Sequence, residues 1–315
     1  PPAVISVFLG DQLTDVLNEL STGKPSALRQ GGNLQMGVTT IPDLPKDIAD
    51  RNRTSPFAFT GKKFEFRMLG SSMSIADCNI IINTAVAEIV SRIADRLEKA
   101  EDIHAECRAI VQDVMRDHRR VIFNGNNYSE EWRREARQRG LPELASTVDA
   151  AGELITQKSI ELFEKHGVFN RKELESRYEI RLEGYCKTVQ IEASTMVEMT
   201  LRQIIPAVTE YSRFLAETLC RLKDTGLTLD VTLEAGLLKD VSAASAALRL
   251  ALGKLEKLLE KGAAMEDGYE KARFFQEKLL PAMEALRAPA DRLETMLGKE
   301  YWPMPTYTDL LYGIL

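Results

Sequence analysis

Apolar residues recur along most of the chain at the spacing of amphipathic helices. The segments 79–100 and 103–123 carry them at positions i, i+3 and i+4, which predicts two helices. Three longer stripes of the same kind occupy 170–226, 237–258 and 275–293. Long helices of this type bury their stripes only against one another or against a partner. The second half of the chain is therefore predicted to be a helical bundle.

Capping residues mark where several of these helices begin and end. Ser129 is a suitable N-cap for a short basic helix that ends at Gly140. Asn170 and Glu173 have the spacing of a capping box, which predicts that the longest helix begins there. Pro206 lies inside that helical stripe, so we expect a kink near it.

The first part of the chain has patterns that are typical of strands and turns. Residues 4–9 are almost continuously apolar and end at Gly10, which predicts a strand buried on both faces. Asp11 can cap a short helix through Leu20, and the stretch 21–45 is rich in Gly, Pro, Asn and Ser, which predicts a long surface loop.

A period of two replaces the helical period after Phe57. Apolar residues at 57 and 59, a turn at Gly61 and alternating residues from 63 to 68 predict a β-hairpin. Phe64, Phe66 and Met68 should then face the core, and the residues between them should face the other way. With the helices, this predicts an α+β chain that is mostly α.

Composition and charge narrow the class of protein. The chain is 44% apolar and 28% charged, as expected for a globular protein. Its 41 Lys and Arg against 47 Asp and Glu give a net charge of −6, so no overall positive field favours a nucleic acid or an anionic membrane. Its four cysteines form no C-x-x-C pair, and we find neither an apolar run of transmembrane length nor a leader. We therefore expect a cytoplasmic protein.

The hairpin also carries the strongest candidate for chemistry. Lys63, Glu65 and Arg67 alternate along one strand, so they lie on one face about 6.6 Å apart. Such a row can hold a divalent metal at the carboxylate and phosphate or carboxylate oxygens at the two cations. Arg51 and Arg53 precede the hairpin and could add guanidinium groups. The alternative is a solvated strand face whose charges pair with one another.

Other candidates are weaker. The segments 21–24 and 60–62 resemble parts of a phosphate loop, but they lack its full pattern and are rejected. His118 could act as a general base, although a structural role at a helix end fits it better because no nucleophile pattern lies beside it. Four arginines at 133, 134, 137 and 139 could bind phosphate, but neighbouring glutamates favour a solvated, charge-balanced face.

Residues 51–67 read RNRTSPFAFTGKKFEFR and resemble the active-site strand region of type III glutamine synthetases. Further similarity to this family occurs at 1–12, 121–129, 168–174 and 302–307. The resemblance implies that residues 1–140 form the end of the catalytic domain, with strands of its sheet, and that 141–315 form a helical C-terminal domain. It also implies an upstream part of the protein, so we expect the 315 residues alone to be inactive.

The family makes glutamine from glutamate, ammonia and ATP through γ-glutamyl phosphate, with Mg²⁺ or Mn²⁺. By the resemblance, Glu65 is a metal ligand, Arg67 binds glutamate and the phosphoryl group in transfer, and Arg53 and Lys63 hold ATP phosphates. The resemblance further implies a homododecamer of two hexameric rings. One departure concerns these roles directly: Ala58 stands where other members carry an arginine. Prolines of the family are also replaced here by Leu69 and Cys78.

A second hypothesis comes from a different class of protein. The chain could be a non-catalytic helical scaffold or regulatory interaction protein that keeps the strand motif without the catalysis. The metal ligands that the resemblance places upstream would separate the two hypotheses.

Overall fold

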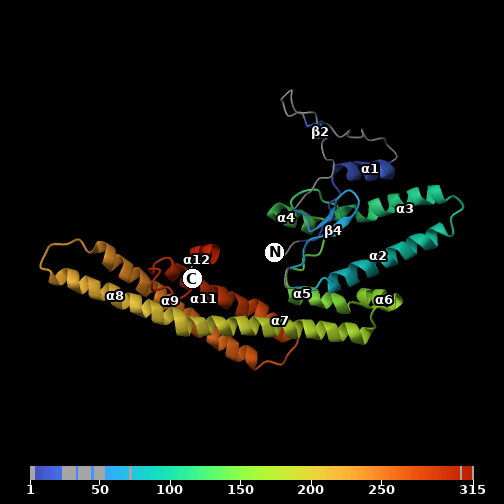
Figure 1. The fold of residues 1–315 in the computed structure, drawn as a ribbon. Helices are drawn as coiled ribbons and strands as arrows, with labels where there is room; N and C mark the ends of the chain where they lie inside the picture. Colours follow the sequence, from blue (N-terminus) through green and yellow to red (C-terminus); the bar gives the residue numbers. More distant parts are fainter. Residues whose placement is uncertain are drawn as a thin grey trace. The chain divides into compact units, whose positions relative to one another are not determined.

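The computed structural model of this chain describes residues 4–22, 33–34, 44–45, 54–70, 73–305 and 307–313. They form two compact units, Pro1–Glu175 and Ser176–Leu315. The fold is α+β and mostly α, as the sequence predicts (Figure 1). The expected family boundary after residue 140 is a separate matter and stays a prediction.

A small set of extended segments forms the centre of the first unit. The hairpin consists of β3 (Phe57–Phe59) and β4 (Phe64–Phe66), paired antiparallel. The extended segment 4–9 lies beside β3 through a parallel bridge between Phe8 and Ala58, and beside Ile122 through a parallel bridge from Val7. The segment predicted as a strand therefore forms only two isolated bridges, at Val7 and Phe8, and not a full strand. It is not buried on both faces as expected, because Ile5 is 51% exposed.

The two faces of the hairpin differ from our expectation. Phe57 and Phe59 lie opposite Phe66 and Phe64, so these four rings share one face, here called the aromatic face. The prediction that Phe64, Phe66 and Met68 face the core is wrong: Phe64 is 48% exposed and the other two are only half-buried. The reason is that the buried side chains Phe8 and Ala58 belong to the opposite face, which packs inward.

Several helices of the first unit pack on one another. The α1 helix (Asp11–Thr22) lies beside α3 (Ile103–His118), and α2 (Ala76–Leu97) precedes α3 in the chain (Figure 1). A short 3₁₀ turn, η1 (Arg119–Val121), leads into the segment that bridges to Val7. Of the loop predicted at 21–45, Ser21 and Thr22 belong to α1. Two short strands within it, β1 (Asn33–Leu34) and β2 (Leu44–Pro45), pair antiparallel, and its other residues lie outside the described part.

Trp132 anchors the next helix, α4 (Glu130–Gln138), to the start of the chain. Its side chain is fully buried, stacks on Phe123 with ring centroids 4.1 Å apart, and donates from Nε1 to the Val4 carbonyl at 3.0 Å. The predicted cap is confirmed, because Ser129 Oγ accepts from the Trp132 backbone N–H. Gly140 follows the helix with a φ angle of +68°, a conformation that glycine adopts without strain.

Three short helical segments were not predicted from the sequence. They are α5 (Thr147–Ala151), the 3₁₀ turn η2 (Gly152–Ile155) and α6 (Gln157–Lys165). In α6, Ile160 and Phe163 pack with Leu174 in a small buried cluster. These segments are too short to show the helical period clearly, which explains why sequence reasoning missed them.

Long helices make up the second unit. The α7 helix (Arg171–Met199) opens with the predicted capping box: the Asn170 N–H donates to Glu173 Oε2 at 2.8 Å, and the Glu173 N–H donates to Asn170 Oδ1 at 3.0 Å. A π-turn, η3 (Thr200–Ile204), joins it to α8 (Ile205–Asp224). The π-turn ends just before Pro206, which lies in the first turn of α8, and the kink expected near Pro206 stays a prediction.

The remaining helices pack around α9 (Thr232–Ala263), which contacts both α8 and α11 (Leu280–Glu294) (Figure 1). A short α10 (Tyr269–Phe274) and a π-turn, η4 (Phe275–Leu279), lead into α11, and α12 (Tyr307–Tyr312) follows. The predicted bundle is thus confirmed. Its fully buried leucines, which form the interior, are Leu182, Leu248, Leu252, Leu255, Leu279, Leu286 and Leu293.

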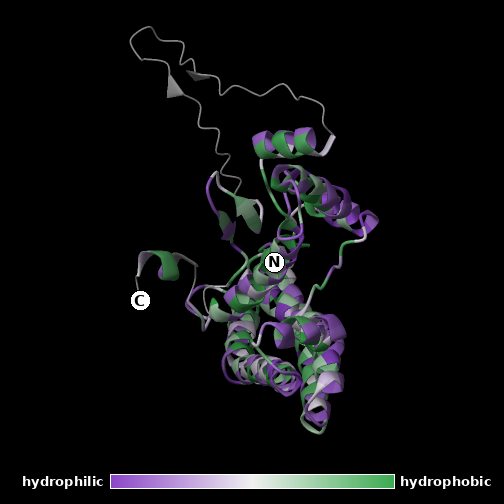
Figure 2. Cartoon of the chain, turned by 90° about the vertical axis from the view of Figure 1, so that its right-hand side faces the viewer, coloured by the Kyte–Doolittle hydropathy of each residue, from purple (hydrophilic) through white to green (hydrophobic). Residues whose placement is uncertain are grey.

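Hydrophobic and hydrophilic residues alternate along the helices of both units (Figure 2). Among the described residues, no helix combines the length and the apolar character needed to cross a membrane.

Candidate functional site

The charged row predicted from the sequence forms on β4. Lys63 Nζ lies 3.2 Å from Glu65 Oε1, and Arg67 donates to Glu65 Oε2 from both Nε, at 3.0 Å, and Nη2, at 2.7 Å. Alternation along the strand places the three side chains on one side, as expected. We call Lys63, Glu65 and Arg67 the charged row. The structure thus brings together three of the four predicted site residues.

Neighbouring cations set the charge of Glu65. Hydrogen bonds from Arg67, and next from Lys63, hold the pKa of the Glu65 carboxyl below its ordinary value. The carboxylate is therefore ionised at neutral pH, which both metal binding and ion pairing require. Exposure decreases along the row, since the side chain of Lys63 is 63% exposed, that of Glu65 34% and that of Arg67 24%. Lys63 is therefore the most exposed cation of the row, and Arg67 lies in the more enclosed position.

Ala58 lies directly opposite Glu65 across the hairpin. Directly paired residues of neighbouring strands project to the same side, about 5 Å apart at Cβ. The position where the resemblance places an arginine in other members is therefore the cross-strand neighbour of Glu65. In this chain a buried methyl group stands there instead, with 1% exposure. If the resemblance holds at this position, the row has one cation fewer beside its carboxylate than in other members.

The fourth predicted residue, Arg53, lies outside the described residues. Its chain neighbour Thr54 is described, and the Thr54 carbonyl accepts from the Asn127 N–H at 3.0 Å. The predicted role of Arg53 in holding ATP phosphates stays a prediction.

A divalent metal at Glu65 needs further ligands. Among the described residues no group of three or more His, Cys, Asp and Glu side chains converges as a metal cluster. Mg²⁺ takes six oxygen ligands in octahedral geometry, some of them waters, and usually one or two carboxylates. Glu65 fits as one such ligand because it is ionised and partly exposed.

The weaker candidates from the sequence have ordinary structural roles. His118 is exposed at the end of α3. The arginines of α4 pair with carboxylates, which confirms the charge-balanced face: the pairs are Arg133 with Glu130 and Glu143, Arg134 with Glu131, Arg137 with Glu143, and Arg139 with Glu135.

One cluster of charged residues was missed in the sequence because its members are far apart. Glu88 in α2 is 8% exposed and accepts from Lys165 Nζ at 2.7 Å and from Arg92 Nε at 2.7 Å. His166 Nε2 lies 2.9 Å from the same carboxylate. Sequence alone gives only the α2 pair at i, i+4, because Lys165 and His166 follow Glu88 at separations of 77 and 78 residues.

Comparison of the sequence with known proteins finds similarity to glutamine synthetases. The sequence model of the glutamine synthetase C-terminal domain matches residues 106–223. A glutamine synthetase of Butyrivibrio fibrisolvens is 34% identical over 320 residues, covering 100% of this chain and 45% of that protein. A type-3 glutamine synthetase of Dictyostelium discoideum is 33% identical over 319 residues, covering 99% of this chain and 43% of that protein.

These relatives are similar to the chain over its whole length, which includes both the charged-row hairpin and the helical bundle. The chain belongs to the glutamine synthetase family. It spans a little under half the length of the curated relatives that it matches, 45% in the case of the Butyrivibrio protein.

Proposed function

We propose that this chain is the C-terminal portion of a glutamine synthetase, the enzyme that joins ammonia to glutamate at the expense of ATP through γ-glutamyl phosphate. The single observation that carries the proposal is the charged row: a carboxylate held ionised between two cations on one strand of a family member. Phosphoryl transfer depends mainly on positioning and charge neutralisation, and both tasks suit these residue types.

We assign the roles residue by residue. Glu65 supplies one oxygen ligand to Mg²⁺ or Mn²⁺, and the bound ion neutralises charge on the ATP phosphates. Arg67, the more enclosed cation, binds the glutamate side chain and the phosphoryl oxygens in transfer. Lys63 holds an ATP phosphate, and we expect Arg53 to do the same.

The ion pairs within the row fit such a role. Both cations contact Glu65, so the three charges of the row are paired with one another. An anionic substrate offers the cations new partners, and a metal ion offers one to Glu65. On binding, the two cations can replace their contacts with Glu65 by contacts with the substrate, and Glu65 can replace its contacts with the cations by a contact with the metal. No group of the row has to change its charge.

We also propose that the 315 residues alone do not catalyse the reaction. Glu65 is one ligand, and the described residues hold no metal cluster around it. The complete protein, as a homo-oligomer such as the dodecamer implied by the resemblance, would supply the other ligands. The purified 315-residue chain should lack γ-glutamyl transferase activity, and measurable transfer would contradict this part of the proposal.

The test of the proposal is Glu65→Gln in the full-length protein. The variant keeps the size of the side chain but removes the charge on which a hard divalent ion depends. Glutamine synthesis should fall, and raising the Mg²⁺ concentration should restore part of it. Glu143→Gln is the matched control, because Glu143, like Glu65, is paired with two cations, here Arg133 and Arg137, and lies far along the chain from the hairpin.

The outcomes separate catalysis from the alternative. Loss of activity in Glu65→Gln with metal-dependent rescue, and near-normal activity in Glu143→Gln, supports the ligase. Near-normal turnover in Glu65→Gln would show that the row is a solvated strand face. A full-length protein with no synthetase activity at any metal level would favour the scaffold hypothesis.

A further inference from the structure

The α2 helix has two different halves around its axis. At about 100° per residue, all of its charged residues fall on one half. They are Asp77, Glu88, Arg92, Asp95 and Arg96. The other half carries no charged residue over the whole length of α2. We call the large apolar residues of that half the uncharged face, and they are Ile82, Val86, Ile89, Val90, Ile93 and Leu97.

The charged half of α2 packs on the neighbouring helices. Glu88 is 8% exposed and contacts Lys165 and His166 at the end of α6. Arg96 pairs with Glu106 of α3. Figure 1 shows α2 between α3 and α6, which agrees with these contacts. The described part of the first unit therefore covers the charged half of the helix.

The uncharged face is exposed instead. Val86 is 54% exposed, Ile89 48% and Val90 57%, and the other three members are half-buried. A surface helix normally has the opposite arrangement, with its apolar stripe on the core and its charged residues in water. Single exposed apolar residues are common, but a row of them along one face of a helix marks a contact surface.

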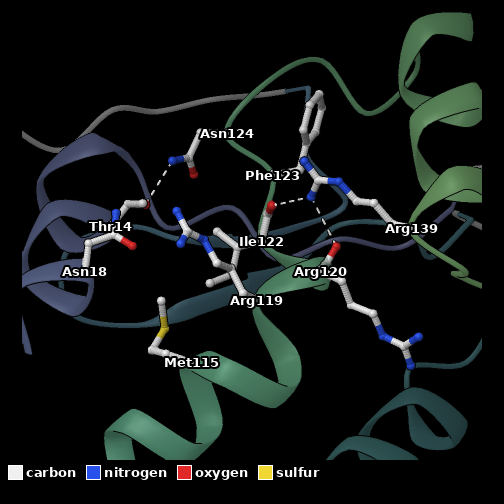
Figure 3. Close-up of a pocket in the computed structure, with 9 residues that line it drawn as sticks. All are labelled: Thr14, Asn18, Met115, Arg119, Arg120, Ile122, Phe123, Asn124 and Arg139. Carbon is white, nitrogen blue, oxygen red and sulfur yellow. Dashed lines mark hydrogen bonds between the residues drawn. The ribbon is translucent and has the colours of Figure 1, made fainter. Parts of the chain in front are cut away.

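The neighbouring helix α3 shows how a covered apolar face looks in the same unit. Ile110 and Met115 of α3 are 7% and 6% exposed, and α1 packs on α3. Figure 3 shows the Met115 side chain directed toward the side where Thr14 and Asn18 of α1 lie, and the three residues line a cavity of about 450 Å³. The described residues thus cover the apolar face of α3 and leave that of α2 open.

The β-hairpin of this unit has an open edge as well. The Arg67 N–H donates to the Pro56 carbonyl at 2.7 Å, so the backbone of β4 alternates between this side and the outer edge. At Phe64 and Phe66 the backbone groups point to the outer edge, where no described residue pairs with them. Folded proteins usually cover or block such an edge. The outer edge of β4, like the uncharged face, is thus a surface on which further protein can pack.

The lengths of the relatives indicate what covers the uncharged face. The chain makes up 45% of the Butyrivibrio protein and 43% of the Dictyostelium protein. More than half of such a protein therefore lies outside the matched part, and the proposed function places that portion upstream. Contacts between separate molecules usually have a polar rim around an apolar centre. The uncharged face has no charged residue over about six turns of helix, as expected for a surface that is covered within one folded chain.

We propose that the uncharged face of α2 packs against the upstream part of the same polypeptide in the full-length protein. The inference rests on the proposed function in one respect, namely that this chain is the C-terminal portion of a longer one. The α2 helix then lies between two parts of the polypeptide. Its charged half contacts α3 and α6, and its uncharged face contacts the upstream part. The two parts therefore share a core and depend on each other for stability.

Photo-crosslinking in the full-length protein identifies directly what covers the face. p-Benzoylphenylalanine in place of Val86 should, on irradiation, form a covalent bond with a peptide from upstream of residue 1, which mass spectrometry identifies. The product should keep the mass of a single chain on a denaturing gel. The control carries p-benzoylphenylalanine in place of Asp95, which is exposed on the charged half, and should give no crosslink to upstream peptides.

A matched pair of charge substitutions measures the burial. In this chain Val90 and Ala85 are both exposed, so glutamate would be tolerated at either position if nothing covered α2. We expect Val90→Glu to lower the melting temperature of the full-length protein by about 5 °C or more, and Ala85→Glu to change it by about 1 °C or less. Val90→Ala adds no charge and should also lower the melting temperature, because a covered side chain loses its contacts.

Two crosslinking results would overturn the proposal by naming a different neighbour. A product with the mass of two chains would show that a second copy covers the face, and a crosslink to residues 23–53 would assign it to that segment. Absence of any crosslink from position 86, or an unchanged melting temperature in Val90→Glu and Val90→Ala, would mean that the face stays in water. Val90→Ala decides the matter if the larger substitutions do not fold.

Failure of the proposed function would be recognised separately, since none of these readouts is an activity. Glutamine synthesis is measured on the wild-type full-length protein. An inactive protein that still gives the upstream crosslink would refute the ligase and not the inference. An active protein without that crosslink would refute the inference and not the ligase.

Discussion

Arg67 donates two hydrogen bonds to a single oxygen of Glu65, from Nε at 3.0 Å and from Nη2 at 2.7 Å. The two residues are separated by one position along the strand, so the side chain of Arg67 turns back to reach the carboxylate. This leaves the other carboxylate oxygen, Oε1, to Lys63 at 3.2 Å. The two oxygens of Glu65 thus have different partners, which any metal or substrate at this site must replace separately.

The first prediction concerns the planar guanidinium group of Arg67. Arg67→Lys keeps the positive charge but cannot make two parallel contacts, and Arg67→Ala removes both charge and contacts. In the full-length enzyme we expect kcat to fall by about 10²-fold or more in Arg67→Ala at every metal concentration, with a smaller fall in Arg67→Lys. Steady-state kinetics over a range of Mg²⁺ concentrations measures both.

A matched control exists on α4. Arg133 also contacts one oxygen of a glutamate, Oε1 of Glu143, through Nε at 2.8 Å and through Nη2. Because Arg133 lies outside the charged row, Arg133→Lys should leave kcat unchanged. Equal effects of the two lysine variants would show that the loss in Arg67→Lys reflects a general disturbance of the fold.

A pH-dependent contribution to stability is predicted for Glu88. Hydrogen bonds from Lys165, His166 and Arg92 lower the pKa of its carboxyl to about 2. Because the pKa is depressed in the folded state, the stabilisation is fully present above the ordinary value of 4.5 and is lost as the pH falls toward 2. Glu88→Gln should lower the melting temperature at pH 7.

The difference in melting temperature between wild type and Glu88→Gln should shrink as the pH falls from about 4.5 toward 2. Thermal melts at a series of pH values measure it. The exposed Glu101, changed to Gln, provides the control and should show no such trend. A difference that stays constant over the whole range would mean that Glu88 contributes through packing and not through its charge.

The third prediction compares two buried tryptophans. Trp132 donates to the Val4 carbonyl, whereas Trp302 Nε1 is buried with no acceptor among the described residues. Trp132→Phe should cost about 1–3 kcal/mol, since it leaves a carbonyl unpaired, and Trp132→Ala about 3–5 kcal/mol. Trp302→Phe removes no hydrogen bond to a described residue and should cost less than Trp132→Phe. Urea unfolding gives the free energies, and the reverse order would refute the role assigned to the Val4 contact.

Sequence patterns predicted the long helices, their caps and the hairpin because these depend on local signals. The reciprocal hydrogen bonds of Asn170 and Glu173 follow from two residue types at one spacing. The direction of the aromatic face could not be predicted, because a period of two defines two faces without saying which of them is covered. Burial of Phe8 and Ala58 decides it, and that depends on residues far along the chain.

The charged row was predicted because its three members are neighbours on one strand. The cluster at Glu88 was not, since Lys165 and His166 follow Glu88 at separations of 77 and 78 residues and none of the three belongs to a motif. Sites on one element are visible in a sequence, whereas sites between elements need the fold.

The last prediction uses two glycines of the same helix, α9. A Cβ at Gly262 would clash with the ring of Phe275, which is fully buried, whereas a Cβ at Gly253 would meet no atom within 4 Å. Gly262→Ala should therefore destabilise the protein by about 1–3 kcal/mol through overpacking. Gly253→Ala should stabilise it by about 0.5–1 kcal/mol, because alanine loses less conformational entropy than glycine in a helix interior. Urea unfolding of both variants checks the difference in sign. If both substitutions stabilised the protein, the close contact between α9 and Phe275 would be wrong.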